Sequence, residues 1–486
     1  MRCLVTGATG YIGGRLVPSL LAQGHTVRCL ARDPSKLGDV PWIGDVEVVR
    51  GDVLDEDSLR EAMHDVDVVH YLVHSLDNKG FAGLDRRAAL RTAHAAREAG
   101  VRRIVYLGGL KPAGEELSEH LASRTEVGEI FLCSGVPTAV LQAAMIIGSG
   151  SASFEMLRYL TERLPVMVVP KWAHNRIQPI AVRDVLRYLA GCTGLPAEVN
   201  RTFDIGGPDV LTYQDMMRRY ASVAELPRRT MIPVPLLTPR LSSHWVNLVT
   251  PVPRGIAKPL IDSLKHEVVC GEHDIAEYIP DLARSPLLGY DKSVEFALAK
   301  IRDAQVETRW SNASLPDAPA NPLPSDPDWS GGSIYTDVRE ADCAADVEKL
   351  WRVIEGVGGS NGWYSFPPAW AVRGWLDRLA GGVGLRRGRR DQARLFLGDA
   401  VDWWRVEEVD RGRLLRLRAE MKVPGGAWLE MRAEPREGGG SHYHQRAVFV
   451  PKGLLGHIYW RGIAPFHGVV FGGMVRNIVH TAELPG

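Results

Sequence analysis

The feature that most constrains the fold is a glycine-rich turn directly after the first apolar run. Residues 2–6 read as a strand, and Gly7-Ala8-Thr9-Gly10-Tyr11-Ile12-Gly13 then follows the spacing GxxGxxG and leads into an amphipathic segment. Such glycines let the backbone turn tightly and let a pyrophosphate approach the free amides of a helix N-terminus. A merely flexible turn does not require the strand before it and the helix after it. We therefore predict a dinucleotide site made by Gly7, Thr9, Gly10, Tyr11, Ile12 and Gly13.

The first 192 residues alternate short apolar runs with longer amphipathic stretches, which is typical of βα units that wind a parallel sheet. We predict an α/β fold, a Rossmann doubly wound parallel sheet, followed by a small substrate lobe from about residue 177. Residues 228–288, rich in proline and leucine, are interpreted as a helical cover near the cofactor cleft. The predicted strands are residues 2–6, 26–31, 47–50, 66–73, 103–107 and 138–143.

The end of the second predicted strand bears on which nicotinamide nucleotide is bound. An NAD site normally has an acidic residue there to hold the ribose 2′-hydroxyl, but here the strand is followed by Arg32. A guanidinium matches the 2′-phosphate of NADP, Lys36 adds a second cation, and Asp33 weakens the match slightly. An exposed loop arginine is the alternative interpretation. We predict NADP(H) as the cofactor, with Asp52 and Val53 beside its adenine.

In these motifs the chain resembles the extended and atypical short-chain dehydrogenase/reductases, particularly the NmrA-like NAD(P)H-binding group. The resemblance covers residues 1 to about 300 and rests on TGATGYIG, LARDPSKL, GDVLD, VYLGGL, PIAVRDV and FDIGGP, in family order. It implies an NADP-binding cleft beside a small substrate lobe. It also implies hydride chemistry with a serine, a tyrosine that protonates the carbonyl oxygen, and a lysine four residues later that lowers the tyrosine pKa and holds the nicotinamide ribose.

The chain departs from that catalytic pattern. The strand that would deliver the serine ends in Leu107-Gly108-Gly109, and alignment on spacing puts His120 and Arg124 in place of the tyrosine and the lysine. In one interpretation His120 is the acid, because imidazole titrates near neutrality, and Arg124 holds the ribose. In the other, the helix has lost catalysis and the cofactor is a structural or sensory ligand. Arginine binds a ribose but never deprotonates, so it cannot tune a proton transfer as lysine does.

Other polar groups follow predicted strands, at the edge where open α/β sheets place their sites. Leu72 and His74 end the fourth strand and Gln142 ends the sixth, so all three are predicted near the cofactor. For His74 or Gln142 alone, a loop or capping role is the stronger interpretation. The function we predict is an NADPH-dependent reductase of a hydrophobic carbonyl, enone or quinone. The alternative is a non-catalytic NADPH sensor or hydrophobic-ligand carrier.

A proline-rich stretch divides the chain. Five prolines lie with small and acidic residues in 311–332, a composition that extends stiffly and builds no core. We predict an NADP-binding domain with its substrate lobe at 1–310, a linker at 311–332, and a second domain at 333–486. The second domain reads as a strand, an amphipathic helix, the strand-like runs 393–409, 413–423, 427–435 and 441–451, and a long apolar helix.

That order resembles the helix-grip fold of the START and polyketide-cyclase superfamily, which implies an α+β domain around an apolar cavity. The segments GGSNGWYSF and PKGLLGHIYWRGIAPFH also resemble a domain found fused to such reductases. Aromatic residues here either line a pocket for a lipid, quinone or polyketide-like ligand, or fill the core. The tryptophans in question are Trp363, Trp370, Trp375, Trp403, Trp404, Trp428 and Trp460.

Charge and cysteine usage limit the classes of partner. Lys plus Arg equals Asp plus Glu at 58 each, which predicts no nucleic-acid partner. No apolar run reaches about 18 residues, so we expect no integral membrane segment and leave peripheral membrane contact open. The six cysteines lack zinc-site spacing and are expected to be buried free thiols, with no metal bound. A strand that starts at the second residue leaves no room for a signal peptide, so a cytoplasmic location is expected. The predicted partner is a small hydrophobic molecule, and the oligomeric state is unknown.

Overall fold

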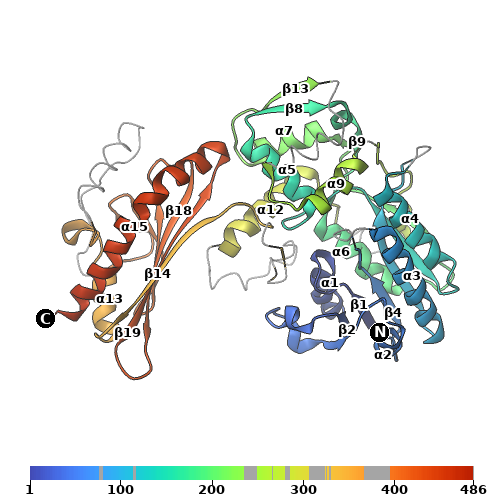
Figure 1. The fold of residues 1–486 in the computed structure, drawn as a ribbon, viewed down its shortest axis with the longest axis horizontal. Helices are drawn as coiled ribbons and strands as arrows, with labels where there is room; N and C mark the ends of the chain where they lie inside the picture. The colour runs from blue at the N-terminus through green and yellow to red at the C-terminus, as the bar shows by residue number, and fades with distance from the viewer. Residues whose placement is uncertain are drawn as a thin grey trace. The chain divides into compact units, whose positions relative to one another are not determined.

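The computed structural model divides the chain into two compact units, Met1–Gly332 and Ser333–Gly486, and each is described by itself (Figure 1). The residues that the structure describes are 1–75, 80–112, 117–234, 249–264, 266–279, 285–305, 323, 326–327, 330–365 and 394–484.

The first unit is built on a seven-stranded parallel sheet. Its strand order is β11-β6-β5-β4-β1-β2-β3, and each neighbouring pair runs parallel. The order reverses between β1 and β4, which is where an open α/β sheet binds ligands beyond the carboxyl ends of its strands. The predicted Rossmann fold is confirmed. The strands are β1 (Arg2–Thr6), β2 (Thr26–Ala31), β3 (Glu47–Arg50), β4 (Val68–Tyr71), β5 (Arg103–Gly109), β6 (Thr138–Ala143) and β11 (Arg201–Ile205).

Helices cover both faces of this sheet (Figure 1). On one face α1 (Tyr11–Ala22) and α6 (Val182–Gly191) share an apolar core with Val5 and Leu107. On the other face α2 (Glu56–Ala62), α3 (Phe81–Glu98) and α4 (Glu119–Leu132) share a core with Val69 and Tyr106. Neighbouring residues of one strand thus enter opposite cores, as expected for a parallel sheet that is buried on both faces.

A smaller lobe follows the sheet and has a core of its own. Its helices are α5 (Ala152–Arg163), α7 (Tyr213–Val223), α9 (Arg254–Ser263) and α12 (Tyr290–Gln305). The short α10 (Ile275–Tyr278) packs instead against β11, with Ile275 in the core of the sheet. Its short strands are β7 (Ile146–Ile147), β8 (Val166–Pro170), β9 (Arg176–Ile177), β10 (Ile180–Ala181), β12 (Leu211–Thr212) and β13 (Thr230–Val234). The expectation of an all-helical cover over 228–288 is wrong at its start, because β13 pairs in parallel with β8.

The second unit is a six-stranded antiparallel sheet with two helices. The strand order is β14-β19-β18-β17-β16-β15. The chain passes through β14 (Tyr335–Cys343), α13 (Val347–Glu355), β15 (Ala400–Val401), β16 (Trp404–Asp410), β17 (Leu414–Ala419), β18 (Gly425–Pro435), β19 (Ser441–Pro451) and α15 (Gly453–Glu483). Asp346 caps α13 by accepting the Lys349 amide at 2.8 Å. The predicted antiparallel sheet and long helix are confirmed, whereas membership of the helix-grip superfamily stays a prediction.

The long helix α15 is buried to different extents along its length. Its C-terminal half packs Met474 and Ile478 into the core of the second unit. Its N-terminal half leaves Leu455, Phe466 and Val469 mostly exposed, at 70%, 66% and 64%. Over the described part of the chain, no helix combines the length and hydropathy required to cross a bilayer.

The described tryptophans of the second unit divide between the core and its edge. The rings of Trp363 and Trp403 stack with centroids 6.2 Å apart, and both are buried together with Trp404. Trp460 stacks on Phe449 and on Tyr335. Filling of the core therefore accounts for three of these rings. Trp370 and Trp375 lie outside the described residues.

The structure differs from the sequence-based expectations in the exposure of one cysteine and in the lengths of two strands. The six cysteines are free, but Cys133 is exposed because it follows the last turn of α4, so the expectation that all six are buried is wrong. The predicted fourth strand is shorter than expected and the fifth is longer, because β5 continues to Gly109 in register with β6.

Candidate functional site

The glycine turn between β1 and α1 is shaped by close backbone contacts. Gly7 has a φ of +76°, and a Cβ there would lie 2.8 Å from the carbonyl oxygen of Leu72. A Cβ on Gly13 would lie 2.2 Å from the carbonyl oxygen of Gly7. Only glycine fits both places. Gly10, which precedes α1, is exposed, so the first amides of this helix face outward and form a cradle for an anion.

The remaining residues predicted for the turn lie around this cradle. Thr9, Tyr11 and Ile12 are half-buried at the start of α1. Leu72 follows β4, and its amide donates to Thr6 Oγ1 at 3.3 Å, which joins the loop after β4 to the end of β1. The turn therefore stands at the point where the strand order reverses.

The end of β2 presents an unpaired cation. Arg32 is exposed and has no hydrogen bond or ion pair with the described residues. The neighbouring carboxylate of Asp33 accepts from the amide and hydroxyl of Ser35, at 3.2 and 2.6 Å, and so caps a short 3-10 turn at Pro34–Leu37. These hydrogen bonds lower the pKa of Asp33. The Asp33 carboxylate is thus engaged by Ser35 in the turn, while Arg32 and Lys36 are exposed and available to bind an anion.

The residues predicted beside the adenine lie after β3. Asp52 is half-buried and one of its carboxylate oxygens accepts the Leu54 amide at 3.0 Å, while Val53 is buried in the core. The second carboxylate oxygen of Asp52 accepts no hydrogen bond from the residues that the structure describes. Asp52 therefore offers a hydrogen-bond acceptor just after the end of β3.

A second group of predicted residues gathers at the carboxyl ends of β4 and β5. Arg124 of α4 donates to the Leu107 carbonyl oxygen at 3.1 Å, and its guanidinium lies over the Tyr106 ring at 5.5 Å. The charge of Arg124 acts on His74 and on His120. His74 is thus brought close to His120 and Arg124, which lie one turn apart on α4.

Protein surroundings keep both histidines of this group neutral. His120 lies in the first turn of α4, where burial, then Arg124 and His74, lower its pKa to about 3. Part of the His74 side chain reaches the surface. Desolvation of its ring by the surrounding protein, and then the charge of Arg124, lower its pKa to about 4. The expectation that His120 titrates near neutrality is therefore wrong, because a buried imidazole beside a guanidinium resists a second positive charge.

The imidazole of His120 is held by hydroxyl groups. Its Nδ1 lies 3.3 Å from Ser263 Oγ, and Ser263 Oγ lies 3.0 Å from Ser118 Oγ and 2.9 Å from the Pro259 carbonyl oxygen. Ser118 also caps α4 by accepting the Leu121 amide. The same hydroxyl chain that starts the helix therefore fixes the ring plane of His120.

His120 and Ser263 border a mainly apolar cavity of about 70 Å³. This is several times the roughly 10–15 Å³ that one water molecule requires. The cavity lies beyond the carboxyl ends of β5 and β6, and residues of the lobe line its other side. Its walls are Gly109, Leu110, His120, Leu121, Ala143, Ala144, Met145, Ser153, Met156, Ile177, Tyr213, Leu260, Ser263, Leu264 and Val268.

Gly109 lies close to α4 at the end of the strand that would deliver the serine of the family pattern. A Cβ there would lie 2.9 Å from Leu121 Cδ2, so a serine at this position would require the Leu121 side chain to move. Gln142 is half-buried within β6, in register with Gly108 and Asp204. Gln142 does not take part in the interactions that join His74, His120 and Arg124.

Sequence reasoning missed two polar members of the site. Ser263 comes from α9, 143 residues after His120, and no local motif marks it. Asp85 is buried in α3, accepts from Ser123 Oγ at 3.4 Å and feels the charge of Arg124, while burial raises its pKa. An aspartate on the apolar face of the segment FAGLDRRAALRTA was the one available signal for it.

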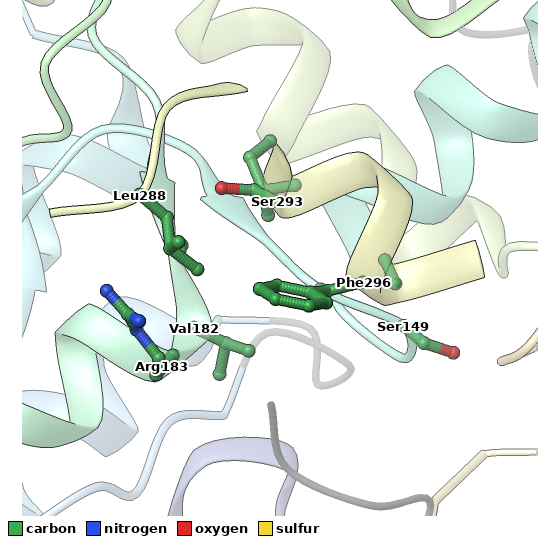
Figure 2. A pocket seen from close by; sticks show the side chains of 10 residues that line it. Ser149, Val182, Arg183, Leu288, Ser293 and Phe296 are labelled. Atoms are coloured by element: carbon green, nitrogen blue, oxygen red, sulfur yellow. The ribbon is translucent and has the colours of Figure 1, made fainter. Parts of the chain in front are cut away.

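A second pocket lies between α6, α12 and β7 and is shown in Figure 2. Its volume is about 10 Å³, which is room for one water molecule at most. Arg183 on its rim is already engaged by Asp184, at 2.8 Å, and by the Pro286 carbonyl oxygen. This pocket is therefore too small for a substrate.

No cluster suited to a metal ion occurs among the side chains that the structure describes. His442 and His444 lie two residues apart on β19 and share a face, where His442 lies beside Asp342 and Glu340 of β14 and His444 lies beside Glu340. The arginine run at 386–390 lies outside the described residues.

Two protein families match the chain. The family described as "NAD(P)H-binding" matches residues 7–131, and the family described as "Protein of unknown function (DUF2867)" matches residues 329–474. The NAD(P)H-binding match lies within the first structural unit. The DUF2867 match lies within the second unit, except that it begins at residue 329, just before the boundary at Ser333.

Individual relatives match part of the chain. The chain is 24% identical over 309 residues to NADH dehydrogenase (ubiquinone) 1 alpha subcomplex subunit 9 from Arabidopsis thaliana, covering 60% of this chain and 76% of that protein. It is 33% identical over 192 residues to 3 beta-hydroxysteroid dehydrogenase/Delta 5→4-isomerase from Mycobacterium tuberculosis, covering 33% of this chain and 50% of that protein. The solved triphenylmethane reductase of Citrobacter sp. matches with a TM-score of 0.50 at 19% identity, covering 62% of this chain and 100% of that chain.

The last similarity shows the fold alone. The first unit therefore combines a Rossmann fold with a match to the family described as "NAD(P)H-binding" over residues 7–131.

Proposed function

We propose that the chain is an NADP(H)-dependent oxidoreductase that reduces a hydrophobic carbonyl, enone or quinone in the cavity bordered by His120 and Ser263. The observation that carries this proposal is the position of the cavity. It opens at the carboxyl edge of the sheet, on the side where an open α/β sheet binds its ligands, and its walls are mostly apolar. One relative is named as a 3 beta-hydroxysteroid dehydrogenase/Delta 5→4-isomerase, whose substrate is a steroid.

The residues around the glycine turn fit an NADP(H) molecule. Gly7, Gly10 and Gly13 make the cradle for its pyrophosphate, and Arg32 with Lys36 would meet the 2′-phosphate. Asp52 and Val53 would flank the adenine, and His74 and Arg124 lie beyond β4 and β5, where the nicotinamide ribose is expected. Bound NADPH would supply a hydride.

The neutral state of His120 narrows the choice of substrate. A ring with a pKa of about 3 is not protonated at pH 7, so it orients the substrate oxygen by a hydrogen bond rather than delivering a proton as imidazolium. The proton that balances the hydride then comes from water. Quinones and enones fit this best, because the hydroquinone anion or enolate formed by hydride addition is stabilised by delocalisation. A simple ketone would leave a strongly basic alkoxide.

Replacing His120 by glutamine tests this role. We expect turnover with a quinone or enone to fall about a hundredfold, the cost typical of removing one oriented hydrogen bond to the reacting oxygen. NADPH affinity should stay unchanged. Since His120 is neutral throughout, kcat/KM between pH 5 and 8 should keep the same profile in both proteins. His94→Gln, an exposed change on α3, is the matched control.

The pH profile can contradict this assignment directly. If the wild-type profile has a limb between pH 6 and 7 that His120→Gln abolishes, His120 is an acid with an ordinary pKa. A normal turnover in His120→Gln would remove the residue from the reaction altogether.

A non-catalytic NADPH sensor or carrier is the second candidate function. It is favoured by the absence of the tyrosine and lysine and by the bond of Arg124 to the Leu107 carbonyl oxygen, which occupies one of its donors. A sensor would bind NADPH yet consume none with a broad panel of carbonyls, enones and quinones.

For the second unit we propose an independent domain that binds a hydrophobic ligand. The domain limits we propose are 1–310, 311–332 and 333–486. Support comes from the separate core around Trp351, Leu417 and Ile478. The exposed Leu455, Phe466 and Val469 of α15 support peripheral contact with a membrane surface as its means of reaching such ligands.

Expression of residues 333–486 alone tests the domain proposal. We expect a protein that unfolds cooperatively and whose tryptophan fluorescence changes when fatty acids or quinones are added, because Trp363, Trp403 and Trp404 lie in its core. The full chain is the control. A fragment that only aggregates would show that the second unit depends on the rest of the chain.

A further inference from the structure

The helix that carries the glycine turn contains a buried arginine. Arg15 of α1 has a side chain only 2% exposed, and its partner is Asp326, which is 8% exposed and 311 residues away. The pair is bidentate: Arg15 Nη1 donates to Asp326 Oδ1 at 2.7 Å and Nη2 donates to Oδ2. The carboxylate also accepts the Leu323 amide at 2.9 Å. The end of the proline-rich segment is therefore fixed to the dinucleotide-binding helix.

Arg15 connects this contact to the glycine turn itself. Its Nη1 also donates to the carbonyl oxygen of Tyr11, at 3.1 Å, and its guanidinium lies 4.4 Å from the centre of the Tyr11 ring. Tyr11 directly follows Gly10 at the start of α1. A carboxylate from residue 326 therefore acts on the first turn through one intervening side chain.

Glycines make room for these contacts. A Cβ on Gly14 would lie 2.6 Å from Leu323 Cδ1, so this second glycine after the turn lets the segment lie directly on α1. A Cβ on Gly148 would lie 2.2 Å from the Tyr11 hydroxyl. Gly13 thus makes room for the backbone of Gly7 in the turn, and Gly14 makes room for the side chain of Leu323.

A second anchor lies a few residues later. Glu155 of α5, fully buried, accepts the amides of Gly150 and Gly331 at 3.0 and 3.1 Å. Gly332 is pressed against the guanidinium of Arg158. We call Leu323, Asp326, Pro327 and residues 330–332 the strap. The strap is held by two buried charged groups, Arg15 and Glu155, on two different helices.

We propose that Asp326 is a positioning residue of the cofactor site, which holds the first turn of α1 through Arg15 and Tyr11 so that strap docking and NAD(P)H binding stabilise each other. A buried guanidinium without its carboxylate would turn toward solvent and release Tyr11. Because coupling between two binding events is reciprocal, the cofactor must in turn favour the docked strap. The proposal rests on the cofactor site described above.

Asp326→Asn in the full chain tests the first half of this coupling. We expect the Kd for NADPH to rise about tenfold or more, within the range usual for coupled sites. Asp274→Asn is the matched control, because it also removes a carboxylate that pairs with an arginine, Arg201, at 2.7 Å, but far from α1. An equal loss of thermal stability in both variants with an unchanged Kd in Asp326→Asn would show a merely structural contact and overturn the proposal.

Hydrogen exchange in the unmodified protein tests the second half and does not depend on any variant folding. Saturating NADPH should slow exchange of the Gly331 amide, which is bonded to Glu155. Unchanged exchange at Gly331 in a protein that binds NADPH would overturn the coupling. A protein that binds neither NADPH nor NADH would instead refute the proposed function.

Discussion

Replacing Arg32 by alanine is expected to weaken NADPH binding by about 10- to 100-fold and to leave NADH binding unchanged. A charge-assisted hydrogen bond contributes about 1.5–3 kcal/mol, and about 1.4 kcal/mol corresponds to a factor of ten. Only NADPH carries the 2′-phosphate that Arg32 is proposed to meet. Titration of each nucleotide, followed by the change in intrinsic fluorescence or by calorimetry, measures both affinities.

The control for this experiment is Arg60→Ala. Arg60 is an exposed cation of α2 that pairs with Asp57, so its removal changes the net charge equally without touching the end of β2. If the wild-type protein binds NADH as tightly as NADPH, or if Arg32→Ala keeps full NADPH affinity, the 2′-phosphate is not held by Arg32. Lys36→Ala would then separate the two cations.

Replacing Arg416 by alanine should lower the free energy of unfolding of the second unit by about 3–5 kcal/mol. Arg416 is fully buried on β17 and donates to Glu430 of β18 at 2.9 Å and to Glu408 of β16. Glu430 is 1% exposed. Removal of the guanidinium leaves this buried carboxylate with the more distant Arg446, at 3.7 Å, in place of a hydrogen bond of 2.9 Å. Urea unfolding followed by tryptophan fluorescence measures the loss.

An exposed ion pair in the same sheet provides the comparison. Arg405 of β16 pairs with Glu420 at 2.7 Å, but over a third of its side chain is in solvent. Arg405→Ala should therefore cost less than about 1 kcal/mol. Equal losses in the two variants would mean that burial adds nothing to the Arg416 network.

The sequence predicted the Rossmann half well because its signals are local. The glycine spacing and the apolar runs place β1, β2, β3 and β6 at their observed bounds. A strand buried on both faces is a short apolar run, and such a run is visible without knowledge of its neighbours. The bounds of β4 and β5 differ because they are set by pairing across the sheet, which no single segment encodes.

The candidate catalytic site was less predictable because it is assembled from distant segments. Spacing alone points to His120 and Arg124, but the hydroxyl that fixes the ring comes from Ser263 on another helix. The protonation state of His120 depends on burial and on Arg124 and His74, which are properties of the folded surroundings. Residue type alone predicts that His120 titrates near neutrality, whereas its surroundings in the folded protein lower its pKa.

The contact between Arg15 and Asp326 also constrains the order in which this protein can mature on the ribosome. Chains grow at roughly 5–20 residues per second, so the carboxylate emerges tens of seconds after the arginine. During that interval all strands of the parallel sheet have been made, yet the first helix still carries a cation without its partner. The contact between Asp326 and the first helix therefore forms only as synthesis passes into the second unit.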